Sequence, residues 1–97
     1  MITIGLDAGT TTISGVVYDS ATRSVLATRT LPNKGQLRTQ ASWQDLQDAD
    51  SILETCEMLV EGFRRDFKDV AGIGLSGQMH GTVYVDREGN AISPLAT

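Results

Sequence analysis

Residues 2–18 read ITIGLDAGTTTISGVVY, and this stretch decides the fold that the rest of the sequence completes. Residues 2–6 alternate between apolar and small or polar side chains, and residues 13–18 are rich in β-branched and aromatic types, so both segments are predicted to be β-strands. Residues 7–12 are too few to form a helical crossover between them. The two strands are therefore expected to lie antiparallel. Residues 25–31 form a third β-rich run after a polar turn, which predicts a three-stranded antiparallel meander.

An amphipathic helix is predicted downstream of the meander. Between residues 52 and 67 the apolar side chains recur on one helical face, and charged side chains occupy the other. Asp48 or Asp50 is suitably placed to accept hydrogen bonds from the first helical amides, and Ser51 with Glu54 offers an alternative capping box.

The remaining segments suggest how the meander and the helix combine. Residues 33–47 lack periodicity and are interpreted as a long surface connection. Residues 70–75 are predicted to form a strand parallel to the first one through a right-handed crossover, and residues 82–85 and 91–95 to form a hairpin. This order predicts an α/β fold with a ribonuclease-H-like mixed sheet. The helix is expected to cover one face of that sheet, and a further C-terminal portion the other.

Composition excludes several classes of protein. The 97 residues carry 8 Lys and Arg against 12 Asp and Glu, a net charge of −4, without a basic cluster that could follow a nucleic acid. No signal peptide or membrane-spanning run is present in the sequence, so we expect a soluble protein. The single cysteine, Cys56, excludes an internal disulfide, is expected to be a buried inert thiol, and fits the cytoplasm.

The turn after the first strand has the residues of a phosphate-binding turn. Asp7 stands at the end of the strand, where its carboxylate is suited to a hydrated Mg²⁺ ion. Gly9 can adopt a positive φ, which would let backbone amides converge on an anion, and hydroxyl donors come from Thr10, Thr11 and Thr12. A plain hairpin turn capped by Asp7 would show the same residues. The position after the first strand and the elements that follow favour phosphate binding.

A second motif, SGQMHG at residues 76–81, is suited to a small polyhydroxylated ligand. Gln78 provides an amide, Met79 an adaptable apolar wall, and His80 one donor and one acceptor for a sugar hydroxyl. His80 could alternatively be a structural histidine at a strand end. No second histidine or spaced thiol accompanies it, which argues against a metal site. Trp43 is suited either to sugar stacking or to packing.

These motifs resemble those of the FGGY carbohydrate kinases in the actin-like ATPase superfamily. Residues 4–11 are similar to the first phosphate motif of that family, and residues 73–81 to the sugar-site segment of its xylulokinase and sedoheptulokinase branches. Residues 43–52 resemble the family segment in which Trp is followed by Glu-Gln-Asp-Pro. This chain has Leu46-Gln47-Asp48-Ala49 there and thus lacks the acid and the proline.

The resemblance implies roles for particular residues. Asp7 would be the carboxylate that positions magnesium and phosphate, Gly9, Thr10 and Thr11 would form the phosphate turn, and residues 78–80 would line a ketose pocket. Glycerol kinases of the family have an Arg-Glu pair where this chain has Met79 and His80, which argues against glycerol. The catalytic base would be an aspartate beyond Thr97. Asp86 is explained by its own turn and is not expected to replace that base.

The resulting hypothesis is that residues 1–97 are part of the N-terminal actin-like ATPase domain of a longer kinase. The kinase would use ATP and Mg²⁺ to phosphorylate a ketose of the xylulose or sedoheptulose type, and this chain alone would be inactive. Its expected partners are the sugar and the remainder of its own chain; a homodimer is left open. Three alternatives stay open: a nucleotide-switched chaperone or filament ATPase, an acyl-phosphate kinase or glucokinase-like protein, and a complete small interaction module.

Overall fold

The computed structural model describes residues 1–38, 41, 44–78 and 81–97. The elements follow one another along the chain as β1 (Ile2–Ala8), β2 (Thr12–Asp19), β3 (Ser24–Pro32), β4 (Leu46–Gln47), α1 (Ala49–Asp66), β5 (Val70–Gly77) and β6 (Leu95–Ala96).

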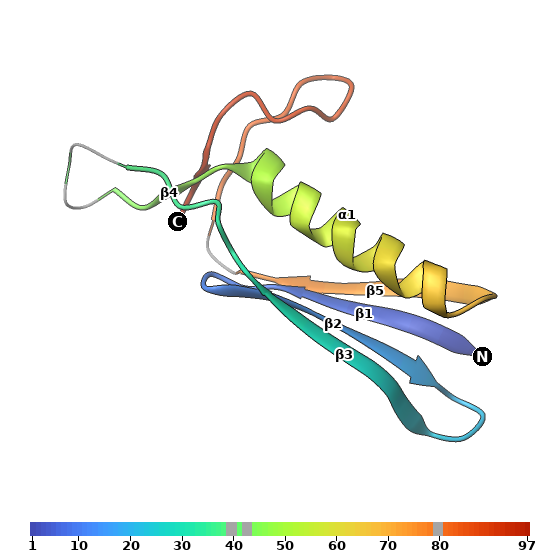
Figure 1. The fold of residues 1–97 in the computed structure, drawn as a ribbon. Coiled ribbons are helices and arrows are strands. Elements are labelled where there is room, and N and C mark those ends of the chain that lie inside the picture. Colours follow the sequence, from blue (N-terminus) through green and yellow to red (C-terminus); the bar gives the residue numbers. More distant parts are fainter. Residues whose placement is uncertain (39–40, 42–43, 79–80) are drawn as a thin grey trace.

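A four-stranded sheet in the order β3-β2-β1-β5 forms the base of the molecule (Figure 1). β2 pairs antiparallel with both β1 and β3, so the predicted meander is confirmed. β5 pairs parallel with β1, as predicted, because α1 carries the chain back across the sheet. The strands extend one or two residues beyond the predicted ranges, which leaves a turn of three residues between β1 and β2.

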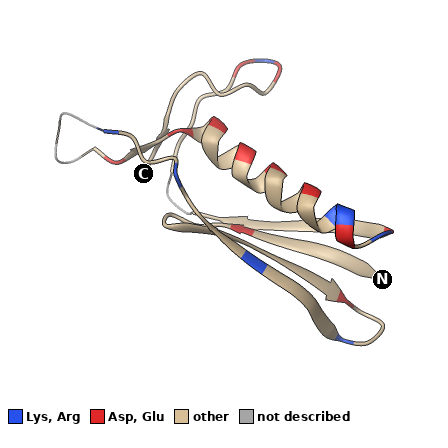
Figure 2. Cartoon of the chain, in the orientation of Figure 1, with Lys and Arg blue, Asp and Glu red and all other residues tan. Residues whose placement is uncertain are grey.

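α1 lies across one face of the sheet (Figure 1), and its acidic residues follow the side that points away from the strands (Figure 2). Asp48 is the N-cap: its side chain accepts hydrogen bonds from the amides of Asp50 and Ser51. A Cβ at Gly15 would lie 2.6 Å from the Phe63 ring, so glycine lets the helix approach β2 closely. The apolar core between helix and sheet consists of Ile4, Leu6, Ile13, Val17, Leu59 and Phe63.

The apolar core between α1 and the sheet does not extend to β5. Ile73 and Leu75 project on the helix side, in register with Ile4 and Leu6, yet they are 49% and 78% exposed. Together with Leu53, Met58 and other residues of α1 they line an apolar groove of about 680 Å³. The opposite face of the sheet is bare, as expected, and carries small or polar residues. At Gly74, for example, an added Cβ would have no atom of the described residues within 4 Å.

Two predictions for the irregular segments need correction. The surface connection over residues 33–47 is confirmed only in part: Lys34 and residues 36–38 are exposed, but Asn33 and Gln47 are buried and β4 pairs with β6. Polar partners described below, rather than apolar periodicity, bury Asn33 and Gln47. The predicted hairpin keeps its antiparallel pairing, but through two isolated bridges, Val85 with Ala91 and Thr82 with Ala96, rather than through two continuous strands.

Cys56 lines the apolar groove and is a half-buried free thiol rather than the fully buried one expected. Burial, followed by the nearby Glu57 charge, raises its pKa, so the thiolate form is disfavoured. Among the described residues, no helix combines the length and the apolar character that a membrane span needs.

Candidate phosphate and sugar site

Asp7 lies exposed near the carboxyl end of β1. The parallel register places Ser76 of β5 directly opposite, and the Ser76 hydroxyl donates a 2.8 Å hydrogen bond to Asp7 Oδ1. The other carboxylate oxygen has no side-chain donor among the described residues. On the face of the sheet opposite α1, Asp7 borders a groove of about 600 Å³ whose lining includes the hydroxyls of Ser14, Thr28, Thr30 and Ser76.

The turn after β1 is held by Gly9. Its amide donates to the Thr12 carbonyl oxygen over 2.9 Å, and a Cβ at Gly9 would lie 2.8 Å from that same oxygen. Gly9 does not adopt the positive φ that the sequence suggested. Glycine is needed here because two backbone segments approach closely. The amides of Thr10 and Thr11 donate to no carbonyl in the described part of the chain, and all three threonines are exposed.

Three carboxamides form a cluster next to this turn. Gln47, which is 0% exposed, and Gln78 are paired reciprocally: Gln47 Nε2 donates to Gln78 Oε1 over 3.1 Å, and Gln78 Nε2 donates to Gln47 Oε1 over 2.9 Å. Asn33, which is 8% exposed, donates through Nδ2 to Gln47 Oε1 over 3.1 Å. We call Asn33, Gln47 and Gln78 the amide cluster.

The amide cluster is bonded to the turn at several points. Asn33 Nδ2 donates to the Gly9 carbonyl oxygen over 3.0 Å, and the Asn33 amide donates to the Thr11 carbonyl oxygen over 2.9 Å. The Gln78 side chain also reaches the Gly9 carbonyl oxygen and the Thr10 hydroxyl, each over 3.5 Å. The Gln78 amide continues the β1–β5 pairing with a 3.1 Å bond to the Ala8 carbonyl oxygen. The start of the motif at residues 76–81 therefore contacts the turn directly.

The structure brings together Asp7, the turn residues and Gln78, whereas Trp43, Met79 and His80 lie outside the described residues. Sequence reasoning missed Ser76, which the expected parallel pairing of β1 and β5 could have revealed. It also missed Asn33 and Gln47, for which no periodic signal exists.

The donor set at Asp7 is compatible with magnesium. Across residues 1–38, 41, 44–78 and 81–97, no three His, Cys, Asp or Glu side chains converge on a metal position. Mg²⁺ keeps much of its water and is commonly held by one or two carboxylates together with substrate phosphates, and an exposed aspartate beside hydroxyls satisfies that requirement.

Asp86 lies in a separate turn. It accepts hydrogen bonds from the amides of Glu88 and Asn90 and from the Asn90 side chain. These bonds, with the Asn90 amide first, lower the pKa of Asp86. A carboxylate stabilised in its charged form is a weak proton acceptor.

Comparison with known proteins shows the family of this chain. Residues 2–97 match the family model described as the FGGY family of carbohydrate kinases, N-terminal domain. The chain belongs to this family. A curated FGGY relative, the xylulose kinase of Staphylococcus xylosus, is 30% identical over 92 residues, which cover 94% of this chain and 19% of the relative.

Solved structures of FGGY kinases share the fold. A xylulose kinase from Brucella ovis superposes with a TM-score of 0.83 at 28% identity, and the match covers 99% of this chain and 20% of that one. A ligand-bound xylulose kinase from Lactobacillus acidophilus also gives 0.83, at 23% identity, with 99% and 19% covered. This FGGY chain thus spans about a fifth of the length of these relatives.

Proposed function

We propose that the full-length protein is a kinase that transfers the γ-phosphoryl group of ATP to a hydroxyl of a ketose, and that this chain contributes the phosphate turn and part of the sugar pocket. One observation supports the proposal most strongly. Asp7 and the start of the sugar motif lie at the same end of two adjacent parallel strands, where Gln78 bonds to Ala8 and Ser76 bonds to Asp7.

In this proposal the turn binds the phosphates. The Thr10 and Thr11 amides and the exposed threonine hydroxyls are donors for phosphate oxygens, and Asp7 holds Mg²⁺. The Ser76 hydroxyl keeps one Asp7 oxygen in a fixed position. When bound, Mg²⁺ neutralises the charge that develops on the transferred phosphoryl group.

The sugar class follows from the second motif and from the relatives. Residues 78–80 would line the ketose pocket, with Met79 as an apolar wall and His80 as the hydroxyl partner. The curated relative is named a xylulose kinase, so we favour a xylulose-type ketose over a sedoheptulose-type one.

The remainder of the protein would supply the catalytic base and cover the exposed apolar surface. The radius of gyration is 15.2 Å, against about 12.5 Å for a compact domain of this length. The groove beside β5 remains open. We infer that residues 1–97 form part of an N-terminal domain that is inactive by itself and that acts in the cytoplasm, where ATP is available.

An activity assay with the full-length protein tests the proposal. Wild type should phosphorylate xylulose with ATP and Mg²⁺, and Asp7→Asn should lower kcat by about 100-fold or more, because a charge that positions the phosphates is lost. The matched control is Asp86→Asn, which should leave kcat unchanged. ATP hydrolysis that does not respond to any ketose would instead indicate a nucleotide-switched ATPase.

A further inference from the structure

The side chain of Gln78 is fully occupied by protein groups. Its Nε2 group donates to Gln47 Oε1 and to the Gly9 carbonyl oxygen, which uses both of its hydrogens. Its Oε1 atom accepts from Gln47 Nε2 and from the Thr10 hydroxyl. These bonds hold the Gln78 carboxamide against the turn and Gln47, although the motif alone suggested only a ligand contact.

Gln47 is the central member of the amide cluster. It is the only one of the three that is fully buried, and its Oε1 atom accepts from both Asn33 and Gln78. Asn33 in turn holds the Gly9 and Thr11 backbone on the turn side. The bonds through Gln47 therefore connect the sugar motif on β5 to the turn after β1.

We propose that Gln47 is a positioning residue that sets the distance and orientation between the sugar segment and the phosphate turn. This inference rests on the proposed kinase function and assigns a role to a residue in β4, outside both motifs. Phosphoryl transfer depends on alignment of the attacking hydroxyl with the γ-phosphorus, and a misplacement of about 1 Å can cost about 100-fold in rate.

A neutral amide fits this task better than a charged group. Gln47 must donate to Gln78 and at the same time accept from both Gln78 and Asn33, which a carboxylate or an ammonium group cannot do. A buried charge would also change the field around a polyphosphate, whereas an amide adds no net charge.

The experiment compares two Gln47 variants in the full-length protein. Gln47→Met keeps the length of the side chain but removes its hydrogen bonds, and we expect kcat to fall about tenfold or more while KM for ATP stays within about threefold. Hydrogen exchange should become faster in residues 9–12 and 76–78 and stay unchanged in α1. Gln36→Met is the comparison variant, because exposed Gln36 bridges to Gln47 and its side chain reaches the turn only through one 3.5 Å bond to the Thr10 carbonyl oxygen. Its effect on kcat and on exchange should be clearly smaller than that of Gln47→Met.

Gln47→Glu provides a pH readout that a purely structural role would not give. A protonated glutamic acid can donate to Gln78 Oε1 and accept from Gln78 Nε2, whereas the ionised form can only accept. Burial raises the pKa of such a carboxyl, so the ratio of its kcat to that of wild type should increase as pH falls from about 8 to 6. For Gln47→Met the ratio should not depend on pH.

The outcomes separate this inference from the proposed function. A wild-type protein without ketose kinase activity would overturn the proposed function, and this inference with it. An active wild type in which Gln47→Met keeps its kcat, or shows no faster exchange in residues 9–12, would overturn the inference alone. Equal effects of Gln36→Met and Gln47→Met would also overturn it.

Discussion

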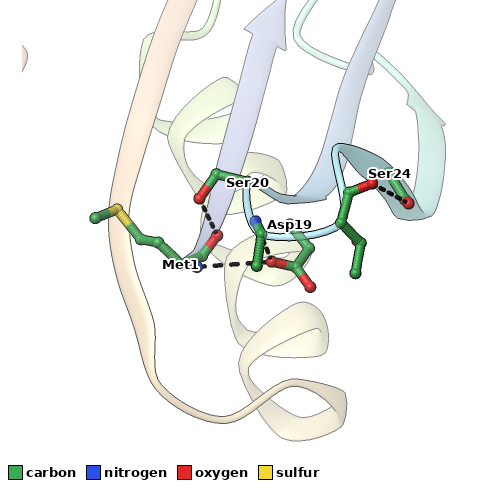
Figure 3. A network of polar contacts seen from close by, with 6 residues as sticks. Met1, Asp19, Ser20 and Ser24 are labelled. Atoms are coloured by element: carbon green, nitrogen blue, oxygen red, sulfur yellow. Dashed lines mark hydrogen bonds and ion pairs between the residues drawn. The ribbon is translucent and has the colours of Figure 1, made fainter.

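The two ends of the β1–β2 pair are closed by polar contacts of different kinds. At the amino end of β1 the Met1 ammonium lies 3.6 Å from Asp19 Oδ1, with Met1 68% and Asp19 20% exposed. The Ser20 hydroxyl also donates to the Met1 carbonyl oxygen (Figure 3). At the carboxyl end of β1, beyond the exposed Asp7, the amide cluster closes the pair through uncharged carboxamides, and Gln47 is completely buried.

Because one arrangement is exposed to water and the other is buried, their contributions to the stability of the fold differ. Water screens an exposed ion pair, so such a pair contributes little to stability. A buried amide that loses its partner keeps the cost of its own desolvation, about 1–3 kcal/mol. The charged end should therefore tolerate substitution, whereas the neutral end should not.

The largest effect is expected at the turn. Gly9→Ala places a Cβ 2.8 Å from the Thr12 carbonyl oxygen, which forces the backbone of the phosphate turn to move. We expect the affinity for ATP to fall by about 100-fold, because the loss of one or two hydrogen bonds to a charged phosphate costs about 3 kcal/mol. Nucleotide titration of the full-length protein measures it.

Gly15→Ala is the control for this substitution. Its Cβ would meet the Phe63 ring, so the variant should lose stability, by about 1–3 kcal/mol, but should bind ATP like wild type below its unfolding temperature. If both alanine variants bind ATP normally, the turn does not hold the phosphates.

A smaller effect, on stability, is expected from the amide cluster. Gln47→Leu leaves Asn33 and Gln78 without their buried partner and should lower the free energy of unfolding by about 2 kcal/mol. Denaturant titration measures this loss. The double variant with Gln78→Leu should lose less than the sum of the two single variants, because the two side chains share their bonds. Additive losses would show that the pair does not act as a unit.

The smallest effect is expected at the charged end. Hydrogen bonding from the Ala21 amide, aided by the Met1 ammonium, lowers the pKa of Asp19 below its ordinary value of 3.8. The folded protein therefore binds this proton less readily than the unfolded chain does. The stabilisation is complete above pH 3.8 and is lost as pH falls through the lower folded-state pKa.

Thermal unfolding of Asp19→Asn at neutral pH should show a decrease smaller than that of Gln47→Leu, and the difference from wild type should disappear in acid. A difference that persists well below pH 3 would contradict this assignment.

The regular part of the fold was predictable because its residues follow simple periods. Alternation predicted β1, β-branched and aromatic residues predicted β2, and the apolar face between residues 52 and 67 predicted α1, whose cap at Asp48 was among the residues considered. Residues 33–47 have no period. Asn33 and Gln47 are buried there through amide bonds between residues 14 and 31 positions apart in the sequence, and a local sequence pattern does not indicate such bonds.

The candidate site was predictable only in part. The glycine and threonine pattern located the turn, but not the contact between Gly9 and Thr12 that explains the glycine. The motif at residues 76–81 drew attention to Gln78 as a ligand residue, whereas its carboxamide points into the protein and is bonded there. A motif shows which residues occur together, and only the fold shows which of their groups are already in use.

Gln47 and Asp48 are neighbours in the sequence but belong to two different features, the amide cluster and the start of α1. Gln47 holds the amide cluster, and the next residue caps α1 while its own amide bonds to the Gly35 carbonyl oxygen over 2.6 Å. A single peptide bond thus links the helix to the polar cluster. A shift of α1 along its axis would pull directly on Gln47, so the helix has a second connection to the end of β1 besides the apolar core.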